Sequence, residues 1–167
     1  MTDVTPTELS RDLRTTVTPD LRRRRWIIGL SIVNAGIGAL VGAYQTGLVR
    51  HLPDPPVGPF DADKVDASDY AYKRMQTPDG LLMMATFSAT AVLAGMGSAD
   101  RAEERPVVPL ALAAKSQYDV GTAAKLAQEE WQTNKALCAW CQAASVLAVV
   151  TLALSLPEAA RAARRLV

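Results

Sequence analysis

Features that indicate nucleic-acid-binding, zinc-binding or repeat proteins are scarce in this sequence. Its 18 Lys and Arg residues nearly balance 17 Asp and Glu residues, so the formal net charge is only +1. Without a basic excess to bind phosphate backbones, no nucleic-acid partner is predicted. The chain has two cysteines and a single histidine, His51. Because a structural zinc site needs about four ligands, zinc bound within one chain is not predicted. We find no internal repeat and no low-complexity tract.

Long apolar runs between patches of charge are the main feature that the sequence does have. The 167 residues suit one domain. Residues 26–49, 80–98 and 136–156 contain no charged side chain. A helix needs about 20 apolar residues to cross the hydrocarbon core of a bilayer. Each of these three runs is therefore predicted to be a transmembrane helix.

A fourth candidate span, residues 106–127, is interrupted by Lys115, Asp119 and Lys125. Lys115 and Asp119 are four residues apart, so they lie on one helix face and can pair. Charges within a membrane normally face the interior of a bundle. This run is predicted to span with its polar face hidden from lipid. The Lys115–Asp119 pair then either shapes a polar wall of a ligand site or is purely structural.

The distribution of basic residues predicts the orientation of the spans. The larger group precedes the first span, lies between the second and third, or follows the fourth: Arg11, Arg14, Arg22, Arg23, Arg24, Arg25, Arg101, Arg105, Arg161, Arg164 and Arg165. Because cytoplasmic segments carry the excess of Lys and Arg, both termini are predicted to be cytoplasmic. The sequence thus predicts an all-α integral membrane four-helix bundle over residues 26–157, with cytoplasmic tails at 1–25 and 158–167.

The two cysteines, Cys138 and Cys141, stand in "LCAWCQAAS" at the outer start of the last span. Two cysteines three residues apart share a helix face and can close a disulfide, and a helix N-terminus favours a thiolate. Cys138 is expected nearer water and Cys141 nearer the lipid phase. Two interpretations remain open: a redox pair, or two buried structural cysteines.

Two stretches resemble the bacterial branch of the vitamin K epoxide reductase family. The first is "LCAWCQAAS", and the second is "DADKVDASDYAYKRMQTPDGLLMM", residues 61–84. The second is similar to the family's first extracytoplasmic loop, with Val65, Ser68, Tyr70 and Pro78 on its pattern. The resemblance implies a four-helix membrane bundle with the CxxC motif at the outer start of the fourth core helix. It covers most of residues 26–157.

The resemblance also implies a reaction and its components. Cys141 is the cysteine expected to react with a bound quinone, either ubiquinone or menaquinone. Cys138 is expected to exchange with a periplasmic thioredoxin-like dithiol protein. Ser68 falls at a loop position that helps to hold the quinone head group. Apart from the resemblance, Tyr118 and Asp119 share a polar helix face and are candidates for quinone binding, although Tyr118 could instead be a packing residue. Trp140 either anchors the helix end at the membrane interface or controls quinone access. The expected location is the bacterial inner membrane, with membrane lipid around the spans and the active site facing the periplasm.

One departure from the family pattern leaves two functions open. The family usually has a second cysteine pair in the first loop, whereas here that loop contains no cysteine and Ala62 occupies the pattern's cysteine position. Either a partner's dithiol reaches Cys138 directly, or the chemistry is altered. The predicted function is a membrane thiol–disulfide oxidoreductase coupled to a quinone. The alternative is a non-catalytic membrane subunit or assembly factor that keeps the bundle.

The helical spacing predicts where a quinone would bind. Two antiparallel helix faces would meet, one carrying Cys138, Cys141, Gln142 and Ser145, and the other Lys115, Tyr118, Asp119 and Thr122. We expect a pocket in the outer half of the bundle that is apolar with a few polar groups. It should open beside Cys141 and be capped by the loop around Ser68.

Overall fold

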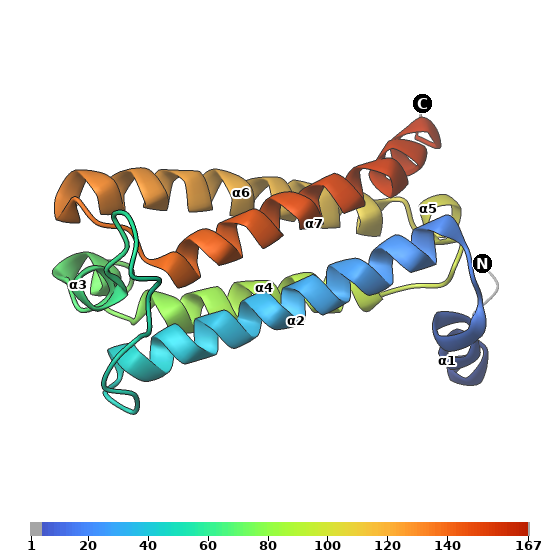
Figure 1. Ribbon diagram of the computed structural model, residues 1–167. Coiled ribbons are helices and arrows are strands. Elements are labelled where there is room, and N and C mark those ends of the chain that lie inside the picture. Colours follow the sequence, from blue (N-terminus) through green and yellow to red (C-terminus); the bar gives the residue numbers. More distant parts are fainter. Residues whose placement is uncertain (1–4, 167) are drawn as a thin grey trace.

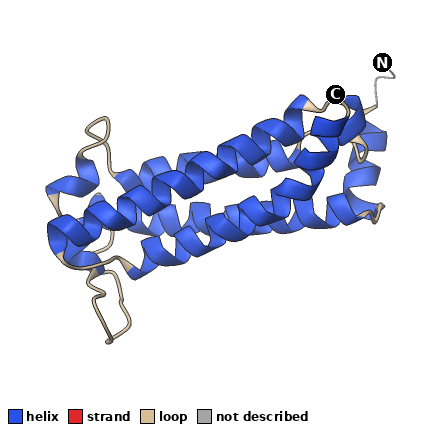
Figure 2. Ribbon diagram, turned by 90° about the horizontal axis from the view of Figure 1, so that it is seen from above, coloured by secondary structure: helices blue, strands red, loops and turns tan. Residues whose placement is uncertain are grey.

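Four long helices lie side by side in the computed structural model, which describes residues 5–166 (Figure 1). They are α2 (Pro19–Gln45), α4 (Asp79–Gly95), α6 (Val107–Asn134) and α7 (Ala139–Arg164). Short helices flank them: α1 (Pro6–Thr15), α3 (Ala62–Asp66), the 3₁₀ helix η1 (Asp69–Tyr72) and α5 (Arg101–Glu104). Residues 5–166 contain no strand, which confirms the all-α prediction (Figure 2).

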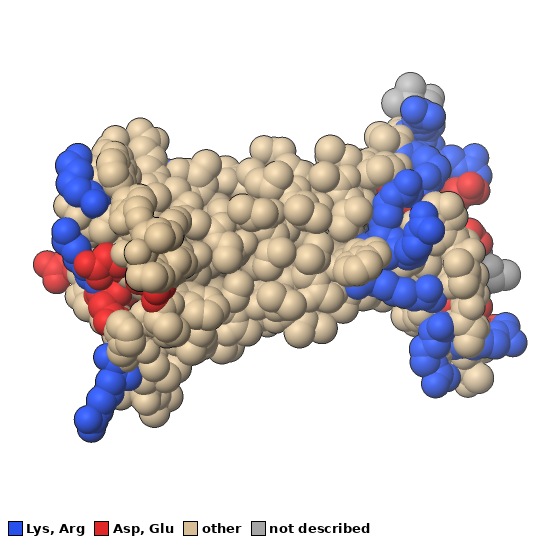
Figure 3. All heavy atoms as spheres, viewed as in Figure 1, with Lys and Arg blue, Asp and Glu red and all other residues tan. Residues whose placement is uncertain are grey.

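Among the helices of residues 5–166, α2 and α7 are the two that are both long and apolar enough to cross a membrane by length and composition. Helix α4 is apolar but has 17 residues, and α6 carries the charges noted above. On the face shown in Figure 3, charged side chains gather at the two ends and leave a broad uncharged band between them. Such a band suits a lipid environment. The crossing of α4 and α6, and the orientation of the termini, stay predictions.

The predicted N-terminal tail contains more helix than the apolar pattern indicated. Helix α1 begins in a capping box, because the Thr5 side chain accepts from the Glu8 N–H while the Glu8 side chain accepts from the Thr5 N–H. Helix α2 begins at Pro19, where Thr18 is the N-cap and accepts from the Leu21 N–H. Capping chemistry, not hydropathy, decides these two starts.

Helix α7 continues to Arg164, past the predicted end of the fourth span at residue 156. Pro157 lies inside the helix, and a proline there removes one backbone N–H donor and favours a kink. The continuation is held by tertiary contacts, since Glu158 and Ala162 are buried and Glu158 pairs with Arg101 of α5. A local stop signal is overridden by packing.

Glycines bring α2 and α4 into backbone contact. A Cβ atom on Gly38 would lie 2.6 Å from the Met84 backbone nitrogen, and Gly80 packs against the backbone of Gly42. Small residues permit this close approach between membrane helices. Gly38 and Gly42 therefore lie in the contact with α4, whereas Gly36 has no atom within 4 Å of its Cβ position.

Two arginines are buried at the terminal end, which we define as the end with α1, α5 and the C-terminus. Arg24 donates to the carbonyls of Ala94, Met96, Gly97 and Ser98. Arg101 donates to both carboxylate oxygens of Glu158 at 2.8 Å. Because the last carbonyls of a helix lack partners within it, these guanidinium groups satisfy the end of α4 and tie it to α2 and α7.

Candidate redox site

The CxxC motif lies at the opposite end, the loop end, where a tight turn joins α6 to α7. Lys135 ends α6 in the left-handed conformation, with φ of 50°. Cys138 is the N-cap of α7, and its sulfur accepts from the Cys141 N–H at 3.2 Å. The thiol thus takes the place usually held by a Ser or Asp side chain. Both cysteines are free thiols on the first turn of α7.

Cys138 is fully buried, which contradicts the expectation that it lies nearer water. Residues 51–66, which we call the cap, fold over the start of α7 and end in helix α3. Leu52, Ala62 and Val65 of the cap pack in one apolar cluster with Cys138. Ala62 of α3 has no exposed surface. Its small side chain lets α3 pack directly on the motif, and this burial covers Cys138.

Hydrogen bonds hold the cap in place. The Asp61 N–H donates to the Leu137 carbonyl at 3.0 Å, and the Leu137 N–H donates to the Pro59 carbonyl at 2.9 Å. Trp140 Nε1 donates to the Pro53 carbonyl at 3.1 Å. Trp140 therefore ties the CxxC turn to the cap.

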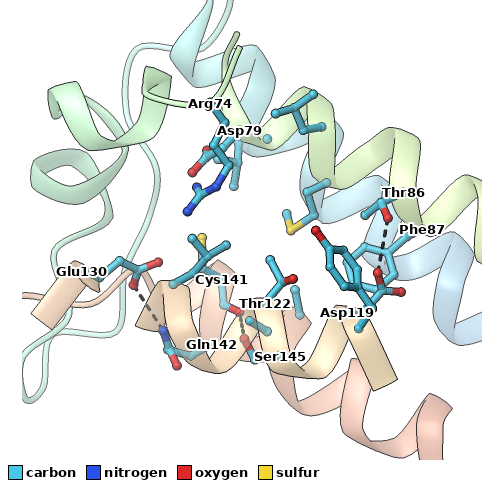
Figure 4. A pocket seen from close by; sticks show the side chains of 18 residues that line it. Arg74, Asp79, Thr86, Phe87, Asp119, Thr122, Glu130, Cys141, Gln142 and Ser145 are labelled. Carbon is cyan, nitrogen blue, oxygen red and sulfur yellow. Dashed lines mark hydrogen bonds between the residues drawn. The ribbon is translucent and has the colours of Figure 1, made fainter. Parts of the chain in front are cut away.

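A cavity opens beside Cys141 between α4, α6 and α7 (Figure 4). The cavity has a volume of about 210 Å³, whereas a single water needs roughly 10–15 Å³. The site is therefore large enough for an organic ligand. Its polar lining consists of Arg74, Asp79, Thr86, Tyr118, Asp119, Thr122, Glu130, Cys141, Gln142 and Ser145.

The structure brings some of the predicted site residues together at this cavity. Tyr118 and Asp119 line it with Cys141. Asp119 is buried and accepts from Lys115 at 2.6 Å, from Thr86 at 3.3 Å and from Thr90 at 3.4 Å. Thr86 joins the same network because Lys115 donates to its hydroxyl at 2.9 Å.

Other predicted residues lie outside the cavity lining. Trp140 contacts the cap, and Cys138 is sealed beneath it. The Ser68 hydroxyl donates to the Val65 carbonyl at 2.6 Å, closing the turn after α3. The loop between α2 and α4 contributes Arg74, not Ser68, to the cavity lining. Asp79 at the start of α4 lines the cavity as well.

Two buried carboxylates beside the motif were not predicted from the sequence. Asp66 is 1% exposed, and its Oδ1 accepts from the Cys141 thiol at 3.9 Å. Glu130 is 3% exposed and accepts from the Cys138 N–H at 3.4 Å and from Gln142 Nε2 at 3.2 Å. Burial raises the pKa of Asp66 to about 7. Glu130 lies beyond the predicted third span, and burial raises its pKa to about 7 as well.

Spacing gives only a weak signal for either carboxylate. Ala62, Val65 and Asp66 follow the i, i+3, i+4 pattern of one helix face, which places an acid in an apolar stripe. Glu130 and Cys138 lie on either side of the short turn that joins two helices, and residues so placed meet in space. Neither pattern distinguishes a buried acid from the many exposed acids nearby.

The two sulfurs and one Asp66 oxygen all lie within 4.8 Å of one another. Such a group offers three ligand atoms, one fewer than the four of a structural zinc site. The absence of a resident metal stays a prediction.

Comparison with known families gives one result. A family model described as Vitamin K epoxide reductase family matches residues 25–156. No curated protein and no solved structure gave a significant match. The matched range contains all four long helices in whole or in large part, the cap and the CxxC turn. The chain therefore belongs to the vitamin K epoxide reductase family.

Proposed function

We propose that this protein is a membrane thiol–disulfide oxidoreductase whose Cys138–Cys141 pair exchanges electrons with a quinone in the cavity beside Cys141. Family membership indicates a membrane redox function involving thiol–disulfide chemistry and a quinone. The observation that carries the specific proposal is the position of Cys141, which is half-buried and lines an apolar cavity with a few polar groups.

The cavity suits a quinone because it offers an unused hydrogen-bond donor. Arg74 Nη1 is buried and has no hydrogen-bond partner among the described residues. Figure 4 shows the Arg74 side chain pointing toward the cavity, near Asp79 and above Cys141. A buried guanidinium nitrogen without a partner is costly to stability, and a carbonyl oxygen of a bound quinone would accept its hydrogen bond. Tyr118 and Asp119 line the same cavity and complete the proposed quinone site.

The chain's own part in the reaction is thiol chemistry. Oxidation of the dithiol breaks two S–H bonds, forms the Cys138–Cys141 bond and releases two electrons and two protons. A quinone supplies the acceptor for these electrons and protons and leaves as the hydroquinone. A partner dithiol then reduces the disulfide by thiolate attack through a mixed disulfide. Because Cys138 is fully buried, this attack requires the cap to move.

We further propose that both termini are cytoplasmic and that the loop end faces the periplasm of a bacterial inner membrane. The terminal end carries the buried Arg24 and Arg101 and the basic C-terminal turn. This bias is what the positive-inside rule associates with the cytoplasm.

The central test uses purified full-length protein in detergent micelles with a dithiol donor and a short-chain quinone. The wild type should form hydroquinone, and Cys141→Ala should abolish this activity. When Cys141→Ala is mixed with the oxidised, disulfide form of the donor, Cys138 should form a mixed disulfide by thiol–disulfide exchange. If the wild type never reduces the quinone and no mixed disulfide forms, the proposal is wrong. An unchanged phenotype of a Cys138→Ser, Cys141→Ser double variant in cells would support the non-catalytic alternative.

The quinone site is tested with Arg74→Met. Losing a charge-assisted hydrogen bond should raise KM for the quinone ~10-fold, whereas Lys73→Met, which alters an exposed neighbour, should leave KM unchanged. Arg74 also pairs with Glu129, so thermal unfolding must confirm that the variant is folded. Equal KM values for both variants would place the quinone elsewhere.

A further inference from the structure

The surroundings of Asp66 differ from those of every other acid in the CxxC region. Its Oδ1 accepts from the Cys141 thiol at 3.9 Å, while its Oδ2 is buried without a hydrogen-bond partner among the described residues. Both sulfurs lie within 4.8 Å of one of its oxygens. Asp66 is thus the carboxylate in contact with the reacting atoms, whereas Glu130 contacts the backbone of the motif.

Asp66 takes part in none of the ion pairs found within residues 5–166. The titratable groups that face it come from the cap, α2, α4, α6 and α7: Asp54, Asp63, Tyr44, Asp79, Glu130, Cys138 and Cys141. All are acids or weak acids. Burial, followed by the charges of Asp79, Asp54 and Asp63, raises the pKa of Asp66 to about 7 against the lowering effect of its hydrogen bond with Cys138. The side chain therefore exchanges its proton at neutral pH.

We propose that Asp66 is a catalytic acid–base residue that takes the thiol proton of Cys141 when the dithiol is oxidised and returns it when the disulfide is reduced. The inference rests on the proposed thiol–disulfide function but does not depend on the oxidant. Two S–H bonds break and one S–S bond forms. The Cys141 proton moves to the Asp66 carboxylate. The Cys138 proton leaves with the acceptor, which receives the two electrons and takes its second proton from water. General acid–base catalysis of this kind contributes about 10²–10⁴-fold to a rate.

A purely electrostatic role would act in the opposite direction. A carboxylate beside a thiol opposes formation of the thiolate, so a residue acting only through its charge would slow the reaction. Removing that charge would then speed the reaction. A proton acceptor, in contrast, is required for the forward step, so its removal slows the reaction. The sign of the effect separates the two roles.

The experiment measures oxidation of the reduced full-length protein in detergent micelles at pH 5–9, using two oxidants. One is a short-chain quinone, followed as hydroquinone, and the other is dipyridyl disulfide, followed as released thiopyridone. Asp66→Asn should slow both reactions ~10²-fold at pH 7, and Asp66→Glu should restore part of the rate. Asp69→Asn, which alters an exposed acid of η1, should match the wild type. The wild-type rate should rise with pH through neutrality, and Asp66→Asn should lose this step.

The two oxidants keep the outcomes distinct. An Asp66→Asn rate equal to or above that of the wild type with both oxidants overturns the role of Asp66, even if the wild type reduces quinone. A slowed Asp66→Asn reaction with dipyridyl disulfide supports that role even if the wild type never reduces quinone, a result that would refute only the proposed quinone coupling. Thermal unfolding of Asp66→Asn at pH 7 provides the folding control.

Discussion

The two ends of this helical protein bury charge in opposite ways. At the terminal end, the Arg101 guanidinium and the Glu158 carboxylate form a pair with two 2.8 Å hydrogen bonds, and both side chains are almost fully buried. At the loop end, Asp66 and Glu130 are buried beside the CxxC motif and neither forms an ion pair among the described residues. Paired charge is compatible with a purely structural role. Unpaired charge is costly to stability and leaves protons that can be exchanged.

The largest expected effect comes from breaking the pair at the terminal end. Arg101→Met leaves Glu158 buried without a partner, and loss of one member of a buried pair costs about 3–5 kcal/mol. We expect a large fall in the midpoint of thermal unfolding in detergent. The exposed Arg165–Glu103 pair provides the control, since Arg165→Met should change stability by at most about 1 kcal/mol.

A double variant sharpens this first prediction. Arg101→Met with Glu158→Met removes both charges and should recover much of the lost stability, because apolar replacement of a whole buried pair is often neutral. If the double variant is as unstable as the single one, the carbonyl contacts of Arg101 matter more than its ion pair.

At the loop end the sign of the stability change should reverse. The pKa of Asp66 is raised from 3.8 to about 7, so the fold favours the neutral carboxyl. Its destabilising effect is absent below pH 3.8, grows as pH rises and is complete above pH 7. Asp66→Asn should therefore stabilise the protein by about 1–3 kcal/mol at pH 8 and have little effect at pH 4. Thermal unfolding at both pH values tests this, and a loss of stability at pH 8 would contradict it.

The smallest expected effect concerns the cap. Trp140→Phe removes the hydrogen bond to the Pro53 carbonyl, which is worth about 0.5–1.5 kcal/mol. Global stability should change little, but Cys138 should become more accessible as the cap opens more often. Alkylation of Cys138 in the reduced protein measures this, and Trp131→Phe, at a half-exposed tryptophan, is the control. Equal alkylation rates would mean that other contacts hold the cap closed.

The comparison of the two ends shows which features can be predicted from local patterns. The helical class follows from long apolar runs, and the family follows from the CxxC stretch together with the first-loop pattern around Val65 and Tyr70. Both depend on residues that are close in the chain. Gly38 and Gly42 of α2 are likewise close in the chain, and they lie where α2 and α4 meet at the backbone.

The burial of Cys138 and the placement of Asp66, Glu130 and Arg74 around the motif and the cavity were decided by tertiary structure alone. Asp66 stands among five other aspartates in residues 54–79, and only the packing of α3 on α7 desolvates it against two thiols. The same packing covers Cys138, although its position at the start of the helix suggested that it lies near water. Hydropathy and spacing are properties of neighbouring residues, whereas desolvation and the absence of a counter-charge depend on segments distant in sequence. For this reason the sequence by itself determined the helical class, the family and the position of the CxxC motif, and only the folded chain decided which acids are buried beside that motif.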